Sequence, residues 1–458
     1  MMIRSITFSL ALLITASATA QNNNDSIMFK RISDDVFMNG TAYSNLRFLC
    51  KKVGARLSGS PQAAKAVTET ARMLKEAGAD TVYLQPCMVP HWVRGAKEVG
   101  KATLTDGKVM PLNIVALGNA VGTNEKGITA KVIEVKSFKE LEALDKDFVK
   151  GKIVFYNYRM DPRYINTFQA YGEAGAYRGQ GPSRAAALGA VGVIVRTLSP
   201  VIDDNPHTGA TRYDEDKPKI PAVAISTLGA VELSKAIAAG KVKDIYFKTN
   251  CKMLEDAPSF NVVGEIRGSE FPDEVITVGG HLDSWDLAEG AHDDGSGCIQ
   301  SIEVIRVLKA LGIKPKRTIR AVMFMNEENG LRGGTAYGNI AKTENKKFIM
   351  ALESDEGGFT PRGFGFTMRP AQLEKVMSWK PLFKPYNADD FKVGGGGADI
   401  GPLGVLGTAM IGLTPDPQRY MDLHHAKTDV FEAVSERELN LGAIVMAQMV
   451  YIVSQYGL

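Results

Sequence analysis

From residue 258 onward, apolar residues fall into a repeating pattern of strand, loop and helix. The runs EVITVGG, RTIRAVMFM and KKFIMALESD are rich in apolar residues on successive positions, as in strands buried on both faces. In the run CIQSIEVIRVLKALG an apolar residue recurs every three positions from Ile299 to Leu308, which predicts a helix that Gly312 ends. This alternation predicts an α/β fold with a mostly parallel mixed sheet and helices on both faces.

The pattern changes before that point and suggests a second unit. Residues 26 to about 80 are typical of helices, and the run TVYLQPCMV is typical of a strand. Between 112 and 255 short apolar strands recur (ITAKVIEV, KIVFYNY, GVIVRT and PAVAIS), with few residues that form a chemical constellation. We therefore expect a main domain in two parts, 21–111 and 256–458, with an α/β module inserted at 112–255.

The first twenty residues, MMIRSITFSLALLITASATA, have the features of a cleavable export signal. An arginine precedes an apolar stretch, and Ala18-Thr19-Ala20 supplies an A-x-A cleavage site. The alternative is a membrane anchor, but the stretch is shorter than the ~20 residues that span a bilayer. We expect an exported protein, periplasmic or secreted, with no later apolar run long enough to cross a membrane.

Composition narrows the classes further. A chain of 458 residues is too long for one ordinary core. The formal net charge of +3, with no long basic cluster, gives no support for nucleic-acid binding. The four cysteines fit no zinc-finger spacing; Cys298 is expected in a helix core, and pairing among the others stays open.

Polar side chains gather where three expected strands end. His281 and Asp283 follow one strand, the pair Glu327-Glu328 follows the next, and Asp355 follows a third. Ligands of such sheets collect at the carboxyl ends of the strands. Converging carboxylates repel each other unless they are protonated or a cation holds them. Mixed histidine and carboxylate ligation suits zinc, and also cobalt or manganese.

Five motifs occur in an order that is specific in combination: H-L-D, D-D-G-S-G, N-E-E-N-G-L-R-G-G, E-S-D and H-H-A-K-T-D. Together they resemble the co-catalytic zinc exopeptidase family, which includes leucyl aminopeptidases, glutamate carboxypeptidase II and carboxypeptidase Q. The segments RLSGSP, PHW, ESDEG and LHHAKTD are most similar to the carboxypeptidase Q branch. The resemblance covers essentially the whole chain after the leader.

The resemblance implies two Zn²⁺ ions per chain and five ligands: His281 and Asp355 on the first ion, Glu328 and His425 on the second, and Asp293 bridging both. It further implies that Glu327 is the general base and that Asp283 orients His281. The roles are chemically reasonable, because adjacent residues leaving a strand point in different directions and can divide labour, and because two metals lower the pKa of water to roughly 7.

Neighbouring residues have plainer interpretations. We expect His292 and His424 either to support the ligands from behind or to lie at the rim of the site, and Asp294 to cap the helix that begins near Ser296. The segment GGGGADIGPL departs from the Ser-Asp-His that the family often has there, and its glycines allow a close backbone approach to substrate. The module at 112–255 resembles a protease-associated domain. The loop around His207 is expected at its surface, and the alternative is that it reaches the active site.

The expected function is that of an exported dizinc metallo-exopeptidase, which hydrolyses dipeptides or terminal residues of short peptides with metal-activated water and Glu327 as the general base. An aminopeptidase acting on longer peptides is the nearest alternative. A glutaminyl cyclase or a non-enzymatic binding protein on the same fold is disfavoured, because all five ligands and the base are present. The resemblance also implies a homodimer.

Overall fold

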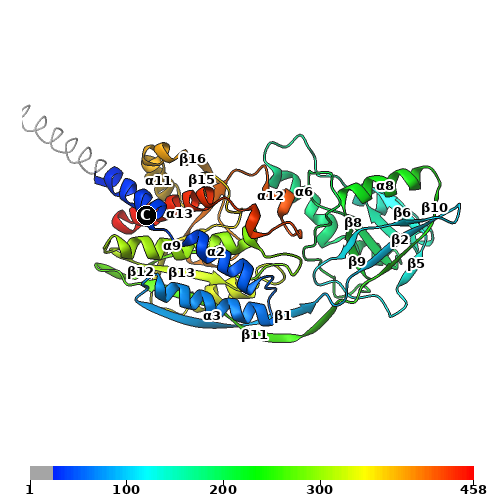
Figure 1. Ribbon diagram of the computed structural model, residues 1–458, viewed down its shortest axis with the longest axis horizontal. Helices are drawn as coiled ribbons and strands as arrows, with labels where there is room; N and C mark the ends of the chain where they lie inside the picture. The colour runs from blue at the N-terminus through cyan, green and yellow to red at the C-terminus, as the bar shows by residue number, and fades with distance from the viewer. Residues whose placement is uncertain (1–23) are drawn as a thin grey trace, which may run out of the picture.

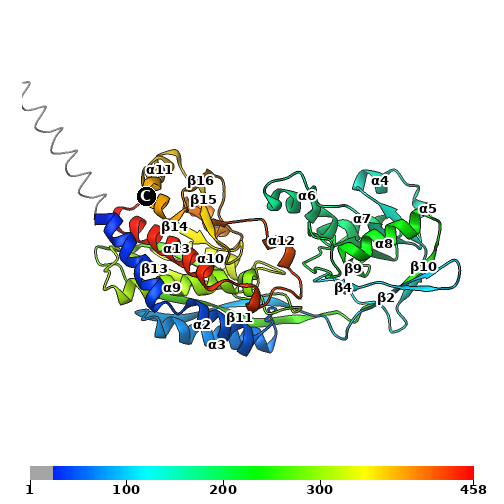
Figure 2. The same ribbon diagram turned by 45° about the horizontal axis from the view of Figure 1, so that its top comes forward.

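The computed structural model describes residues 24–458, and the expected leader at 1–20 lies outside the described residues. Figure 1 shows two lobes side by side, joined along one edge by the long strands β1 and β11. Figure 2 shows that α12 lies between the lobes. The described part of the chain, residues 24–458, starts and finishes in the larger lobe, and the smaller lobe is an insertion between these two parts.

The larger lobe is built on an eight-stranded sheet in the order β1-β11-β13-β12-β14-β17-β15-β16. Its strands are β1 (Thr81–Val93), β11 (Lys252–Ile266), β12 (Phe271–His281), β13 (Arg317–Phe324), β14 (Lys347–Glu353), β15 (Pro361–Thr367), β16 (Asp390–Val393) and β17 (Ala409–Pro415). The central strands β13, β12, β14 and β17 are parallel to one another, and antiparallel pairs flank them. The mixed, mostly parallel sheet expected from the sequence is confirmed in the part that holds the site.

Helices cover both faces of this sheet. They are residues 24–39, α2 (Ala42–Phe48), α3 (Pro61–Glu76), α9 (Ser296–Ala310), α10 (Arg332–Ala341), α11 (Pro370–Phe383), α12 (Tyr420–Leu423) and α13 (Glu436–Tyr456), with shorter turns η1 (Leu49–Val53), η2 (Ala291–Gly295), η3 (Lys384–Tyr386), η4 (Gly401–Leu406) and η5 (Phe431–Ala433). One face packs against α3, α9 and α13 in the main core, and the other packs Tyr337 of α10 and Leu403 of η4. Such burial on both faces explains the near-continuous apolar strands.

Helix α13 corrects one expectation. It is long and apolar enough to cross a membrane, contrary to the expectation that no later run is. However, its most apolar stretch is 83% buried inside the protein. Residues such as Ile444 and Val450 pack in the main core. The helix therefore has the burial of a core helix.

The smaller lobe contains two sheets. A five-stranded sheet has the order β4-β9-β8-β7-β6 and a four-stranded sheet has the order β3-β2-β10-β5. Its strands and helices are β2 (Val99–Leu104), β3 (Val109–Pro111), β4 (Ile114–Ala116), β5 (Ile128–Ala130), β6 (Val132–Val135), α4 (Phe138–Glu142), α5 (Lys146–Val149), β7 (Ile153–Tyr156), α6 (Thr167–Gly179), α7 (Gly181–Ala187), β8 (Gly192–Arg196), β9 (Ala222–Ile225), α8 (Thr227–Ala238) and β10 (Val242–Lys248). Strands β2 and β3 precede residue 112 yet pair within this lobe.

Candidate metal centre

Three parallel strands deliver side chains to one end of the central sheet. His281 is the last residue of β12, Glu327 and Glu328 lie three and four residues beyond β13, and Asp355 lies two beyond β14. Parallel strands end at the same edge, so residues far apart in sequence meet there. The Nε2 atom of His281 lies 3.2 Å from Oδ1 of Asp355 and 3.1 Å from Oδ1 of Asp293.

A second cluster shares Asp293 with the first. The Nε2 atom of His425 lies 3.1 Å from Oε2 of Glu328 and 3.3 Å from Oδ2 of Asp293. The two carboxylate oxygens of Asp293 thus face two different histidine–carboxylate pairs. The structure therefore brings together all five residues that the sequence proposes as metal ligands.

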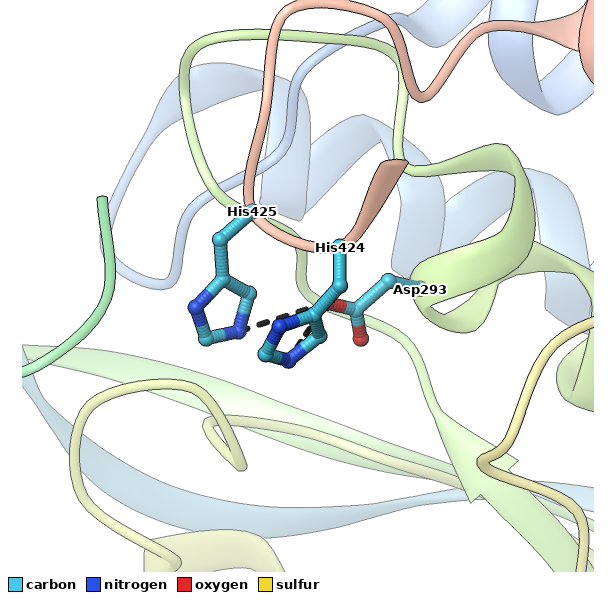
Figure 3. A group of neighbouring side chains, drawn as sticks. All are labelled: Asp293, His424 and His425. Carbon is cyan, nitrogen blue, oxygen red and sulfur yellow. Dashed lines mark ion pairs between the residues drawn. The ribbon is translucent and has the colours of Figure 1, made fainter. Parts of the chain in front are cut away.

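His424, expected behind the ligands or at the rim, lies close to Asp293 and His425. Figure 3 shows His424 and His425 side by side with Asp293. The two rings stack with centroids 3.5 Å apart, and Nε2 of His424 is 3.8 Å from Oδ2 of Asp293. Ligand atoms of these three residues lie within 4.8 Å of one another, so His424 also stands within reach of a cation at this position.

Buried acids hold the loop that carries Asp293. Asp294 accepts hydrogen bonds from the backbone N–H of Gly297 (2.8 Å) and of His281 (3.0 Å), so it caps α9, as expected, and also ties the loop to β12. Asp429 accepts the N–H of Asp293 at 3.1 Å. The carboxylate of Asp293 is fixed by contacts from three different parts of the chain.

Asp283 supports the site through different atoms from those the resemblance implies. The Nδ1 atom of His281 is 2.9 Å from the backbone carbonyl of Asp283, whereas the carboxylate Oδ1 is 3.8 Å away. That Oδ1 accepts the backbone N–H groups of Asn326 (2.6 Å) and Glu327 (3.0 Å). Its side chain therefore positions the Glu327-Glu328 turn, and its main chain orients His281.

The two adjacent glutamates have different surroundings. Glu328 is buried, accepts the backbone N–H of Trp285 at 3.2 Å and faces His425. Glu327 lines the cavity. Burial raises the pKa of Glu327 to about 8, and the nearby Asp355 and Asp283 carboxylates add to the effect of burial, against an opposing contribution from His281.

The buried carboxylates of this centre need compensating positive charge. Burial, reinforced by Asp293, raises the pKa of Glu328 well above its ordinary value, and burial likewise raises the pKa of Asp355. The Oδ2 atom of Asp293 is buried without a hydrogen-bond partner among residues 24–458. Divalent cations would satisfy this oxygen and neutralise the converging carboxylates. The residues present therefore fit a centre that holds metal ions.

Both lobes line a cavity of about 740 Å³ over this centre. The smaller lobe contributes Tyr171, Arg178 and Arg212, and the larger lobe contributes Glu327 and Asp355 among others. Arg178 donates a hydrogen bond to the hydroxyl of Tyr171 at 2.6 Å. Sequence reasoning missed these residues of the smaller lobe, because no motif links them to the distant metal ligands.

The loop around His207 corrects a second expectation. His207 is only 3% exposed, and the N–H of Thr208 donates to the carbonyl of His425 at 3.0 Å. The loop is thus packed against the histidine pair and is not a plain surface loop. Trp92 belongs to the core, where its Nε1–H donates to the carbonyl of Ala120. All four cysteines are buried and free.

Comparison with known proteins identifies the family. The model of peptidase family M28 matches residues 261–450. Carboxypeptidase Q of Bos taurus is 36% identical over 416 residues, which cover 90% of this chain and 85% of that protein, and the Homo sapiens protein matches equally. The crystal structure of a peptidase M28 precursor from Shewanella amazonensis SB2B has 29% identity and a TM-score of 0.89, and the match covers 94% of this chain and 97% of that one. A zinc aminopeptidase from Bacillus subtilis shares the fold, with a TM-score of 0.63, 21% identity and coverage of 89% and 93%. The chain therefore belongs to peptidase family M28 and is a metallo-exopeptidase.

Proposed function

We propose that this enzyme is an exported dizinc exopeptidase that hydrolyses dipeptides or terminal residues of short peptides. The observation that carries the proposal is the position of Asp293, whose two oxygens face His281 with Asp355 on one side and His425 with Glu328 on the other. One carboxylate between two histidine–carboxylate pairs is suited to bridge two cations. Mixed nitrogen and oxygen donors favour zinc over magnesium or calcium.

The ligand roles follow from this arrangement. His281 and Asp355 would hold the first ion, Glu328 and His425 the second, and Asp293 both. When bound, the two ions would supply Lewis-acid polarisation of the scissile carbonyl and lower the pKa of water. The carbonyl of Asp283 accepts the Nδ1–H of His281, which leaves Nε2 of that ring with a free lone pair toward the centre.

Glu327 is the proposed general base that transfers the proton of the attacking water. Its carboxylate lines the cavity, and Asp283 holds its backbone N–H at 3.0 Å. An oxygen of Glu327 would accept a proton from the attacking water and then deliver it to the amine that leaves.

The charge distribution of the cavity supports short peptides with a free carboxyl end. The metal side of the cavity is acidic, whereas Arg178 and Arg212 lie on the side of the smaller lobe. The Nε of Arg178 has no hydrogen-bond partner in the described part of the chain. Guanidinium groups bind carboxylates through paired hydrogen bonds. We propose that Arg212, with Arg178 beside it, binds the terminal carboxylate of the substrate.

The nearest alternative is an aminopeptidase that acts on longer peptides, and it has no need of these arginines. A glutaminyl cyclase or a non-enzymatic binding protein on this fold would not need the second ligand pair together with Glu327. The distinguishing experiment is a peptide panel of free dipeptides, N-acetylated dipeptides, C-amidated dipeptides and longer peptides, scored for the residue released. Hydrolysis confined to free dipeptides and peptides with a free carboxyl end is expected. Equal rates on amidated peptides would favour the aminopeptidase.

Arg212→Gln tests the carboxylate assignment directly. Removal of a charge-assisted hydrogen bond costs about 1.5–3 kcal/mol, so kcat/KM for free dipeptides should fall roughly ten- to a hundred-fold. The rate on C-amidated dipeptides should stay unchanged, because no carboxylate is present to lose its partner. An equal fall on both substrates would contradict the assignment.

Metal content tests the proposed zinc count. Purified enzyme should contain two equivalents of zinc, and His281→Ala and His425→Ala should each lose one of them. Removal of metal with a chelator should abolish hydrolysis, and added zinc should restore it. Well under two equivalents of any divalent ion in the wild-type protein would contradict the ligand set.

Export and assembly rest on the leader features and on the resemblance. We propose cleavage after Ala20, which N-terminal sequencing of the protein recovered from the periplasm or medium would test. We also propose a homodimer, which sedimentation would distinguish from a monomer of the processed chain.

A further inference from the structure

The smaller lobe has a group of cationic side chains that the catalytic centre does not use. In its five-stranded sheet, β6, β7 and β8 run parallel. Lys136 follows β6, Asn157 and Arg159 follow β7, and Arg196 is the last residue of β8. These residues therefore meet at the carboxyl edge of the sheet, the place where α/β folds commonly bind ligands.

Arg196 is the unusual member of this group. It is only 4% exposed, and its Nε–H is buried without a hydrogen-bond partner among residues 24–458. One terminal nitrogen, Nη1, donates to the side-chain oxygen of Asn157 at 3.1 Å. No carboxylate of the described residues forms an ion pair with Arg196, Arg159 or Lys136. A buried arginine normally has a carboxylate or another anion as its partner.

The surroundings of Arg196 strengthen the need for an anion. Burial and the like charge of Arg159 both lower the pKa of Arg196. The nearest acid in the hydrogen-bond chain is Glu134, which accepts from Asn157 at 2.7 Å and from Ser234 at 2.7 Å. Asn157 thus stands between Glu134 and Arg196, and the two charges do not pair directly.

A cavity of about 460 Å³ opens onto this group. Its lining includes Lys136, Asn157, Arg159 and Arg196, together with Asp161. Asp161 is the one acid that lines it, and Arg163 pairs with both of its oxygens. Three cationic side chains consequently face the cavity against one carboxylate that is already compensated.

We propose that this cavity is a binding site for a small dianionic oxyanion of the phosphate or sulfate class, held by Arg196, Arg159 and Lys136. The planar guanidinium of Arg196 offers directed N–H groups to oxyanion oxygens, and Arg159 and Lys136 add charge at the mouth. Two negative charges match three cations better than one does. The site lies in the smaller lobe, apart from the residues that would hold zinc, and it is independent of the proposed peptidase mechanism.

The test measures binding of inorganic phosphate to the zinc-loaded enzyme by titration calorimetry. Phosphate can also bind the metal centre, so the site is located by the double variant Lys136→Gln/Arg159→Gln, whose two side chains are exposed and need not disturb the fold. Lys131→Gln/Lys139→Gln is the matched control, since it removes the same charge from exposed positions that do not line the cavity. We expect one phosphate-binding event to weaken at least about tenfold in the first variant and to stay unchanged in the control.

Further measurements distinguish dianionic oxyanions from other anions. Sulfate should compete with phosphate for this event, whereas acetate at equal ionic strength should compete poorly. Arg196→Lys should weaken the event while keeping the charge, because the fork of donors is lost. Identical phosphate binding in the wild-type protein and in Lys136→Gln/Arg159→Gln would overturn the proposal. Equal loss in the control variant, or competition by acetate as strong as by sulfate, would overturn it as well.

Discussion

Replacing Glu327 with glutamine removes the proposed proton acceptor while it leaves the size of the side chain almost unchanged. Glu327 lines the cavity, and its side chain makes no hydrogen bond or ion pair with any residue of 24–458. The contact that holds it in place is the 3.0 Å hydrogen bond from its backbone N–H to Asp283, which the substitution keeps. We therefore expect the free energy of unfolding to change by no more than about 0.5 kcal/mol.

The effect on the rate should be large. A positioned general base contributes roughly a hundred- to ten-thousand-fold to the rate. At about 1.36 kcal/mol for each factor of ten, this corresponds to roughly 3–5 kcal/mol of transition-state stabilisation. The loss should fall on kcat, because the proposed role of Glu327 is to take a proton from the reacting water and not to hold the substrate in its ground state.

The adjacent Glu328 provides a matched comparison. Its Oε2 lies 3.1 Å from His425 and its Oε1 accepts the N–H of Trp285, so Glu328→Gln should lose activity through loss of one zinc equivalent. The assay measures kcat on a free dipeptide and zinc content for both variants and for the wild-type enzyme. Near-normal kcat in Glu327→Gln with metal bound would refute the base assignment. Loss of zinc in Glu327→Gln equal to that in Glu328→Gln would show that the two roles are not divided.

Two further substitutions test the contact between the lobes and the stability of the sheet. Gly209 has φ +121°, and a Cβ there would lie 2.5 Å from Nη1 of Arg178 and 2.6 Å from Nδ1 of His425. Gly209→Ala should therefore lower kcat/KM roughly ten- to a hundred-fold by displacing these two side chains. Gly401→Ala, with nothing within 4 Å of the new atom, should leave kcat/KM unchanged. Burial opposes ionisation of Glu274, but hydrogen bonds from a lysine and an arginine outweigh the effect of burial and lower the pKa of Glu274 below 4.5. Glu274→Gln should therefore reduce the free energy of unfolding by about 0.5–1 kcal/mol at neutral pH. This difference in stability should be fully present above the unfolded-state pKa of about 4.5 and should disappear as the pH falls through the lower folded-state pKa. A urea-unfolding series from pH 7 to pH 3 that shows a constant difference would contradict this expectation.

Local sequence patterns were sufficient to predict many of the strands and helices of the larger lobe. The period of apolar residues predicted β12, β13, β14 and α9, and α9 was confirmed over Ser296–Ala310. His281, Glu328 and Asp355 could be recognised because each lies at or just beyond the end of a strand, and parallel strands end at a common edge. Asp293 and His425 lie in a turn before α9 and beyond α12, and they were proposed only from the resemblance to the family.

Contacts between distant parts of the chain were decided only by the tertiary structure. The two oxygens of Asp293 face different histidines because Asp294 and Asp429 hold its loop. The carbonyl of Asp283, rather than its carboxylate, lies against His281. Neither choice has a sequence signal, because each depends on backbone direction at a turn.

The smaller lobe shows most clearly the difference between what the sequence predicts and what the tertiary structure decides. The sequence determined that its strands exist and that it carries no catalytic motif, and this was sufficient to separate it from the ligand-bearing part of the chain. Only the folded protein shows that Thr208 holds the loop of His425, that Arg178 and Arg212 line the catalytic cavity, and that Arg196 is buried without an acidic partner. Periodicity and motifs report on neighbours along the chain, whereas these contacts depend on how two lobes pack, and that packing is set by many weak interactions spread over the whole sequence.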